Sequence, residues 1–206
     1  MKTHTIIGTA LMLLIVSSCG SAMKNIWTRE GYTGKHYNKI LVLGAVRNLD
    51  SRTVFESTVV KLLASQGITA ENSLKTIPPI EDINQISKDK IIKAVEEGNY
   101  DGVIVASLLD ITTKDAREGG SPIHGSINNG MGYYGFGYGS YIYSNYNTMY
   151  TPDYYRQVQN YVVETRLFDA KAASVEKAMV WSAESKITSP RSFEMAAESY
   201  ANTVVK

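Results

Sequence analysis

The sequence is short of the residues on which most catalytic and metal sites depend. Its 206 residues include one cysteine and three histidines. His36 and His124 lie far apart in the chain, and neither has a carboxylate neighbour at metal-ligand spacing. We therefore expect no zinc site, no histidine-based catalysis and no disulfide, so that burial of a hydrophobic core has to stabilise the fold. These absences predict a protein that is not an enzyme and that uses neither a metal nor a cofactor.

The sequence also lacks an excess of charge of one sign. It contains 21 lysines and arginines against 20 aspartates and glutamates, a formal net charge of +1. Nucleic-acid-binding domains usually gather a basic excess on one face, so a nucleic-acid partner is not expected. The G-x-G-x-x-G pattern at 130–135 has no predicted strand before it and no predicted helix after it. We interpret this pattern as a consequence of glycine-rich composition rather than as a nucleotide site.

A hydrophobic run near the amino terminus is too short to cross a membrane. As a helix, the run from Ile6 to Val16 would rise about 16 Å, against about 30 Å for the hydrocarbon core. Its length suits a secretory signal, and Ser17-Ser18-Cys19 follows it in the layout of a bacterial lipoprotein signal. We predict that residues 1–18 are removed and that Cys19 carries a diacylglyceryl group and an acyl chain such as palmitate. The alternative is an ordinary signal peptide with a chance cysteine.

Lipidation of Cys19 has consequences for location. Removal of residues 1–18 leaves 188 residues with 20 basic and 20 acidic side chains, so charge does not attract the protein to anionic lipid. Two or three acyl chains are enough for stable anchoring without a membrane span. Gly20 stands where an aspartate favours inner-membrane retention in enteric bacteria. We therefore predict a lipoprotein of the bacterial outer membrane that faces the periplasm.

The rest of the chain predicts one domain. We expect a lipidated tether over 19–38 and a single α/β domain over 39–206. Apolar runs predict strands at 39–46, 68–77, 100–109, 155–168 and 177–185. Helical periodicity predicts helices at 51–66 and 87–97. A last helix is expected after a Ser189 cap, with Pro190 at its first position. The order β-α-β-α-β-(long loop)-β-β-α predicts an α/β (α+β) fold with a layered mixed sheet. In the strand at 155–168, Glu164 and Arg166 are expected on a solvent-exposed face.

An insertion at 119–155 has a composition found nowhere else in the chain. These 37 residues carry one formal charge, Asp153, together with 8 of the 16 glycines and 9 of the 14 tyrosines. Aromatic side chains without charges are typical of the centre of an interface. The alternatives are a mobile low-complexity loop, a surface that stacks on glycan or peptidoglycan, and a membrane hairpin. The candidate partner-binding residues are Tyr133, Tyr134, Phe136, Tyr138, Tyr141 and Tyr143.

Three acids near the strand at 100–109 give a weaker signal. Asp101, Asp110 and Asp115 could mark a ligand site of the kind that α/β sheets place at strand ends. Capping or solvation of a strand end explains them more simply.

Several core segments resemble a known family. They are Tyr37-Asn-Lys-Ile-Leu-Val-Leu-Gly44, Tyr100-Asp-Gly-Val-Ile-Val105, Val163-Glu-Thr-Arg-Leu-Phe-Asp169 and Met179-Val-Trp-Ser182, together with the lipobox at Cys19 and the Tyr/Gly loop. With these segments the chain resembles small Gram-negative lipoproteins that carry a domain of unknown function. Its element order is also similar to the α/β domain of the curli secretion lipoprotein and of the amino-terminal part of TolB.

The resemblance implies a role in assembly. Related domains form envelope rings or dock on partners, whereas the family supplies no catalytic residues. We therefore expect a non-enzymatic interaction or assembly module of the cell envelope, with an envelope protein or further copies of the chain as partner. Binding of glycan, peptidoglycan or a small envelope ligand through the Tyr-rich loop is the alternative, and an enzyme with a site near Asp110 is a weaker one.

Overall fold

The structure is a computed structural model of the chain, described at residues 22–46, 49–77, 87–113, 137–147, 158–188 and 192–205. Within these ranges the strands are β1 (Ala22–Thr28), β2 (Ile40–Ala45), β3 (Ala70–Asn72), β4 (Gly102–Thr113), β5 (Val158–Asp169) and β6 (Met179–Thr188). The α-helices are α1 (Leu49–Ser65), α2 (Lys88–Glu97), α3 (Tyr138–Asn147) and α4 (Phe193–Val204), and short 3₁₀ helices occupy Ser73–Lys75 and Val175–Lys177. The predicted signal peptide and Cys19 lie outside the described residues.

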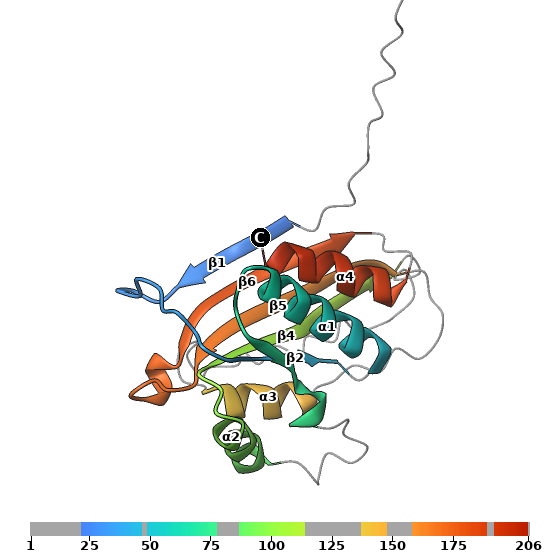
Figure 1. The fold of residues 1–206 in the computed structure, drawn as a ribbon. Helices are drawn as coiled ribbons and strands as arrows, with labels where there is room; N and C mark the ends of the chain where they lie inside the picture. Colours follow the sequence, from blue (N-terminus) through green and yellow to red (C-terminus); the bar gives the residue numbers. More distant parts are fainter. Residues whose placement is uncertain are drawn as a thin grey trace, which may run out of the picture.

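The strands form one mixed sheet in the order β1-β6-β5-β4-β2-β3 (Figure 1). β2 pairs in parallel with both β3 and β4, whereas β1–β6, β6–β5 and β5–β4 are antiparallel. The parallel part follows from the β-α-β connections through α1 and α2, and the antiparallel part from the β5–β6 hairpin. This mixed α/β sheet is the predicted fold class.

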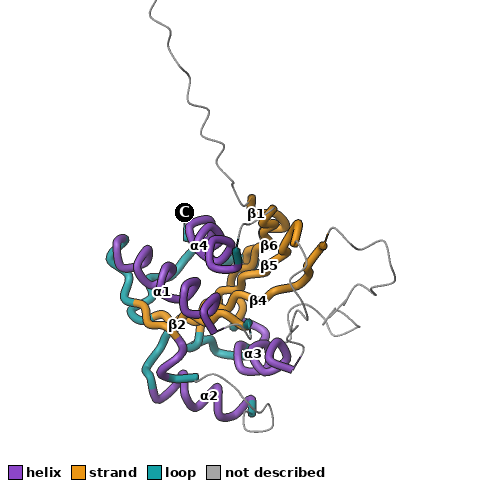
Figure 2. Tube along the Cα trace, turned by 90° about the vertical axis from the view of Figure 1, so that its right-hand side faces the viewer, coloured by secondary structure: helices purple, strands orange, loops and turns teal. Residues whose placement is uncertain are grey.

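Helices cover both faces of the sheet (Figure 2). α1 and α4 pack on one face, and α2 and α3 pack on the other. Alternate residues of β2 therefore enter different cores. Leu41 and Leu43 pack with α2 and α3, whereas Ile40 and Val42 pack with α1 and α4. This arrangement explains why β2 is a continuous apolar run rather than an alternating one.

Local signals that predicted the helices are present at the expected places. Ser87 caps α2, where its side chain accepts a hydrogen bond from the Lys90 amide. Gly67 follows α1 with a φ of 78°, the left-handed conformation that glycine adopts readily. The helix at the carboxyl end begins later than expected, because Ser192 rather than Ser189 is the cap of α4. Pro190 lies outside the described residues.

Two elements were not predicted. Residues 22–28 were assigned to the tether, but they form β1 along β6. α3 lies within the 119–155 segment, which was expected to be a long loop. Conversely, the strand expected at 68–77 is confined to Ala70–Asn72, although it does lie at the edge of the sheet.

Candidate functional site

One end of the sheet lies close to Cys19 in the sequence. Because β1 is antiparallel to β6, it begins where β6 ends, and the alternating directions place the start of β5 and the ends of β2 and β4 there as well. Ala22 pairs with Lys186, Lys186 with Val162, and Val162 with Asp110, so these residues form one row across the sheet. We call this end of the sheet the Cys19 end.

The spacing between Cys19 and β1 limits how far the two can lie apart. Cys19 precedes Ala22 by three residues. At about 3.6 Å per extended residue, the two Cα atoms are separated by at most about 11 Å. Seven residues of the predicted tether belong to the sheet as β1, so the length of chain between Cys19 and the sheet is short.

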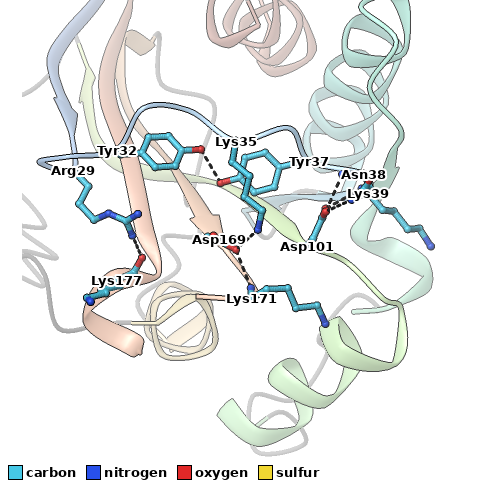
Figure 3. A network of polar contacts seen from close by, with 10 residues as sticks. All are labelled: Arg29, Tyr32, Lys35, Tyr37, Asn38, Lys39, Asp101, Asp169, Lys171 and Lys177. Carbon is cyan, nitrogen blue, oxygen red and sulfur yellow. Dashed lines mark hydrogen bonds and ion pairs between the residues drawn. The ribbon is translucent and has the colours of Figure 1, made fainter. Parts of the chain in front are cut away.

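Residues 29–39 cross the opposite end of the sheet, from β1 at one edge to β2 near the other (Figure 3). Side chains fix this crossing segment at each strand that it passes. Its contacts are Arg29 with the Lys177 carbonyl before β6, Lys35 with Asp169 at the end of β5 (2.8 Å), and Asn38 and Lys39 with Asp101 before β4. A segment held at three strands cannot act as a free linker.

Asp101 is the most strongly bound acid in this crossing. Its carboxylate accepts hydrogen bonds from the backbone amides of Asn38 (2.8 Å) and Lys39 (2.9 Å) and from the Asn38 side chain (3.0 Å). Burial opposes its ionisation, but these donors outweigh burial and lower the pKa of Asp101. The simpler of the two interpretations is therefore supported, because Asp101 binds backbone amides. Asp110 lies toward the other end of β4, and Asp115 is outside the described residues.

Two tyrosines complete the crossing. The hydroxyl groups of Tyr32 and Tyr37 are 3.1 Å apart, and the Lys35 ammonium lies 5.2 Å from the centre of the Tyr37 ring. Burial, and then the hydrogen bond with Tyr32, raise the pKa of Tyr37. Tyr37 therefore stays neutral and serves as a buried bridge between the crossing segment and the sheet.

An apolar pocket lies at the Cys19 end between the sheet and the helices α1 and α4. Its volume is about 60 Å³, and the atoms that face it are all apolar. Small residues leave this room, because Gly44 and Ala106 form part of the floor and Ala196 and Ala197 part of the α4 wall. The remaining lining residues are Val46, Ser51, Phe55, Leu108, Tyr161, Val163, Ile187 and Tyr200. This pocket could not be predicted from local sequence patterns, because its lining comes from six elements.

The predicted contact residues fall into two groups. Tyr138 and Tyr141 are buried in the core (8% and 2% exposed), and Tyr143 is partly buried against it. The burial of Tyr138 and Tyr141 favours a role in the core over the predicted role in partner binding. Tyr133, Tyr134 and Phe136 lie outside the described residues.

Tyr141 forms part of a buried polar cluster on the sheet face beneath α3. Its hydroxyl donates to Glu164 Oε2 at 2.6 Å and accepts from Ser107 Oγ at 3.1 Å. Arg166 forms an ion pair with Glu164 and places its guanidinium 4.1 Å from the centre of the Tyr141 ring. Burial and the neighbouring Glu164 raise the pKa of Tyr141. Glu164 and Arg166 were expected on an exposed face, and this prediction is wrong because both are buried, with Tyr141 of α3 against them.

A second buried cluster ties α1 to β2 and to the turn after β3. Glu56, with no exposed surface, accepts hydrogen bonds from the amides of Gly44 and Ser73 and from the Arg52 side chain. Arg52 also donates to the Ile77 carbonyl at 2.6 Å. Both clusters lie within the packed core, which suits a stabilising role better than a catalytic one.

The described part of the chain lacks two kinds of feature. No group of three or more metal-ligating side chains is present there. No helix within those ranges is long and apolar enough to cross a membrane.

Comparisons with known proteins give little further information. No family model matches the sequence, and no curated protein is similar to it. A variant of the PelC dodecamer from Paraburkholderia phytofirmans is 16% identical and has a TM-score of 0.45, with 89% of this chain and 96% of that chain covered. A second PelC dodecamer structure from the same organism is 15% identical, with a TM-score of 0.42 and coverage of 88% and 97%. At this level of similarity, neither structure bears on the activity or the partners of this chain.

Proposed function

We propose that the protein is a lipid-anchored lipoprotein of the bacterial outer membrane and a non-enzymatic interaction or assembly module that faces the periplasm. The observation that carries this proposal is the short distance between the lipobox cysteine and the sheet. β1 starts three residues after Cys19 and pairs with β6. An acyl group on Cys19 therefore holds one defined end of the domain against the membrane, which suits a module that presents a fixed surface to a partner.

The crossing segment supports the same proposal. A mobile tether would let the domain rotate freely about its anchor, whereas residues 29–39 are bound to the ends of three strands. The contacts include the ion pair between Lys35 and Asp169 and the amide contacts of Asp101. β1 and the segment that follows it are thus both fixed to the sheet, and only two residues separate Cys19 from β1, which limits how far the domain can turn about its anchor.

Fewer aromatic residues remain as candidates for the contact surface. Tyr138 and Tyr141 belong to the core, and Tyr143 packs against it, so the aromatic residues that remain as partner-binding candidates are Tyr133, Tyr134 and Phe136. We propose that they contact an envelope protein or another copy of the chain. Binding to peptidoglycan through the same rings is the competing outcome.

The anchor is tested by changing Cys19 to alanine. We expect the wild-type protein to fractionate with outer membranes and its amino-terminal peptide to have the mass of a triacylated cysteine. The Cys19→Ala variant should lose the lipid mass and leave the outer-membrane fraction. Retention of the variant in that fraction would overturn the lipoprotein assignment.

The contact surface is tested by crosslinking in whole cells. A variant with Tyr133, Tyr134 and Phe136 changed to alanine should lose crosslinked partners or oligomers, while a variant with Tyr133→Phe and Tyr134→Phe keeps the rings and serves as the control. α3 stays intact in both, which a deletion of residues 119–155 would not allow. Unchanged crosslinks in the alanine variant would refute the interface. If the alanine variant keeps its crosslinks and loses only its retention on peptidoglycan, the glycan alternative is favoured.

A further inference from the structure

We propose that the apolar pocket at the Cys19 end binds the end of an acyl chain of a bilayer lipid, and that Leu49 and Met195 enter the membrane interface beside it. The proposal rests on the anchoring of Cys19, because the anchor brings this end of the domain to the bilayer. It goes further by assigning the domain a second contact with the membrane and a ligand chemistry.

The chemistry of the pocket selects the ligand. A cavity of about 60 Å³ whose lining atoms are all apolar offers no hydrogen-bond partner to water or to a polar ligand. Apolar cavities stay dry and take apolar guests, and an engineered cavity of about 150 Å³ holds a benzene molecule. The smaller pocket here has room for the last few carbons of a chain rather than for a ring or a headgroup.

Exposed apolar side chains lie beside the pocket at the same end. Leu49, the first residue of α1, is 46% exposed, and Met195, in the first turn of α4, is 51% exposed. Both helices begin at the Cys19 end, because α1 follows β2 and α4 follows β6. Ser51 and Phe55 of α1 and Ala196 of α4 line the pocket, so the exposed residues precede it on each helix.

A lipid anchor at Cys19 places the bilayer next to the pocket. Ala22 pairs with Lys186, which adjoins the pocket residue Ile187. Cys19 lies within about 11 Å of Ala22, and an acyl chain of one leaflet is about 15 Å long, half of the hydrocarbon core. Lys186 is exposed in the same row and can meet lipid phosphates. The exposed Asp50 lies in the first turn of α1, where the helix dipole favours an acid.

A bilayer lipid suits this pocket better than a second copy of the chain. The anchor presents the Cys19 end to the membrane, where the concentration of acyl chains is far higher than that of any protein side chain. Exposed Leu49 and Met195 are the kind of residues that enter the headgroup–acyl boundary.

The test is photolabelling in a bilayer of known composition. The lipidated protein is reconstituted in vesicles of phosphatidylethanolamine and phosphatidylglycerol that contain a phospholipid with a diazirine near the end of one acyl chain. After irradiation, labelled peptides are identified by mass spectrometry. We expect adducts on the α4 peptide that holds Ala196, Ala197 and Tyr200 and on the α1 peptide that holds Phe55, and no adducts on α2.

Filling the pocket should abolish the signal. Ala197→Leu projects a larger side chain into the pocket, and Ala64→Leu makes the same change on the exposed side of α1. We expect loss of the pocket adducts in the first variant and wild-type labelling in the second. If thermal unfolding shows that Ala197→Leu does not fold, Ala106→Val fills the floor of the pocket instead. Equal labelling of filled and wild-type pockets overturns the proposal.

The failure of this proposal is distinguishable from that of the proposed function. The mass of the amino-terminal peptide reports lipidation of Cys19 independently of the photolabel. If the wild-type amino-terminal peptide carries no lipid mass and the pocket still takes the label, the anchor is refuted and the acyl-chain site is supported. A lipidated protein whose pocket takes label only from a probe placed on its own Cys19 chains would refute the bilayer lipid as the occupant.

Discussion

Replacing Tyr141 with phenylalanine removes one hydroxyl group from the core and leaves the ring in place. That hydroxyl donates to Glu164 at 2.6 Å and accepts from Ser107 at 3.1 Å, and both partners are buried. A hydrogen bond to a charged group contributes about 1.5–3 kcal/mol to stability. The contacts of the ring with Phe168 and Arg166 are kept. We therefore expect Tyr141→Phe to lower the free energy of unfolding by about 1.5–3 kcal/mol.

The assay is urea unfolding at equilibrium, followed by the fluorescence of Trp27 and Trp181. Tyr143 lies on the same helix and is partly buried, so Tyr143→Phe is the control, with an expected change of about 0.5 kcal/mol or less. Tyr141→Ala removes the ring as well and should destabilise the protein by about 3–5 kcal/mol.

Stability and crosslinking together distinguish a core position of Tyr141 from a position on a contact surface. If Tyr141→Phe unfolds at the wild-type urea concentration while the protein loses its crosslinked partners, Tyr141 acts on an exposed contact surface rather than in the core. That outcome would also contradict the position of α3 against β4 and β5. Loss of stability with crosslinks unchanged would support the core position.

Three further predictions concern other contacts of the fold. Asp101→Asn should lower the free energy of unfolding by about 1–2 kcal/mol at pH 7. Because the folded-state pKa of Asp101 is lowered, the difference in stability between variant and wild type should shrink in urea titrations as the pH falls below about 4. Gly139→Ala should lower the free energy of unfolding by about 1–3 kcal/mol and with it the thermal midpoint, because the added Cβ would lie 2.6 Å from Ile92 Cγ1. An unchanged midpoint would contradict the contact between α2 and α3. Glu56→Gln should cost about 3–5 kcal/mol, because Arg52 loses its buried counter-ion, and a change below about 1 kcal/mol in urea unfolding would show that the pair is not buried.

The elements that the sequence predicted are those whose pattern depends on nearby residues. β2 and β4 are continuous apolar runs because both of their faces are covered, and α2 has its own cap at Ser87. β1 could not be predicted in the same way. It is an edge strand whose register shifts between Lys24 and Trp27, and Asn25 has a positive φ of 49°. This irregularity removes the period-two alternation by which a strand is detected.

α3 escaped prediction for a different reason. Its sequence is rich in tyrosine and contains Gly139, and these residues do not favour a helix in isolation. Tyr138, Tyr141 and Ile142 nevertheless follow the i, i+3, i+4 spacing of a buried helical face. The surrounding segment is rich in glycine and tyrosine, a composition that indicates a loop and obscures this spacing. The pocket was beyond local patterns altogether, because Gly44 and Ala196 meet only in the folded chain.

β1 changes what an anchor at Cys19 can do. A free tether over 19–38 would be a coil with a typical reach of about 25 Å, enough for the domain to leave the membrane surface and turn in any direction. Pairing of β1 with β6 reduces this reach to at most about 11 Å between Cys19 and Ala22. With Cys19 lipidated as proposed, a partner would have to meet the domain at the membrane, on its sides or on the end where residues 29–39 cross. If Cys19 is lipidated as proposed, the same strand pairing holds the pocket near the bilayer, so the orientation of the domain and the proposed binding of an acyl chain both depend on β1.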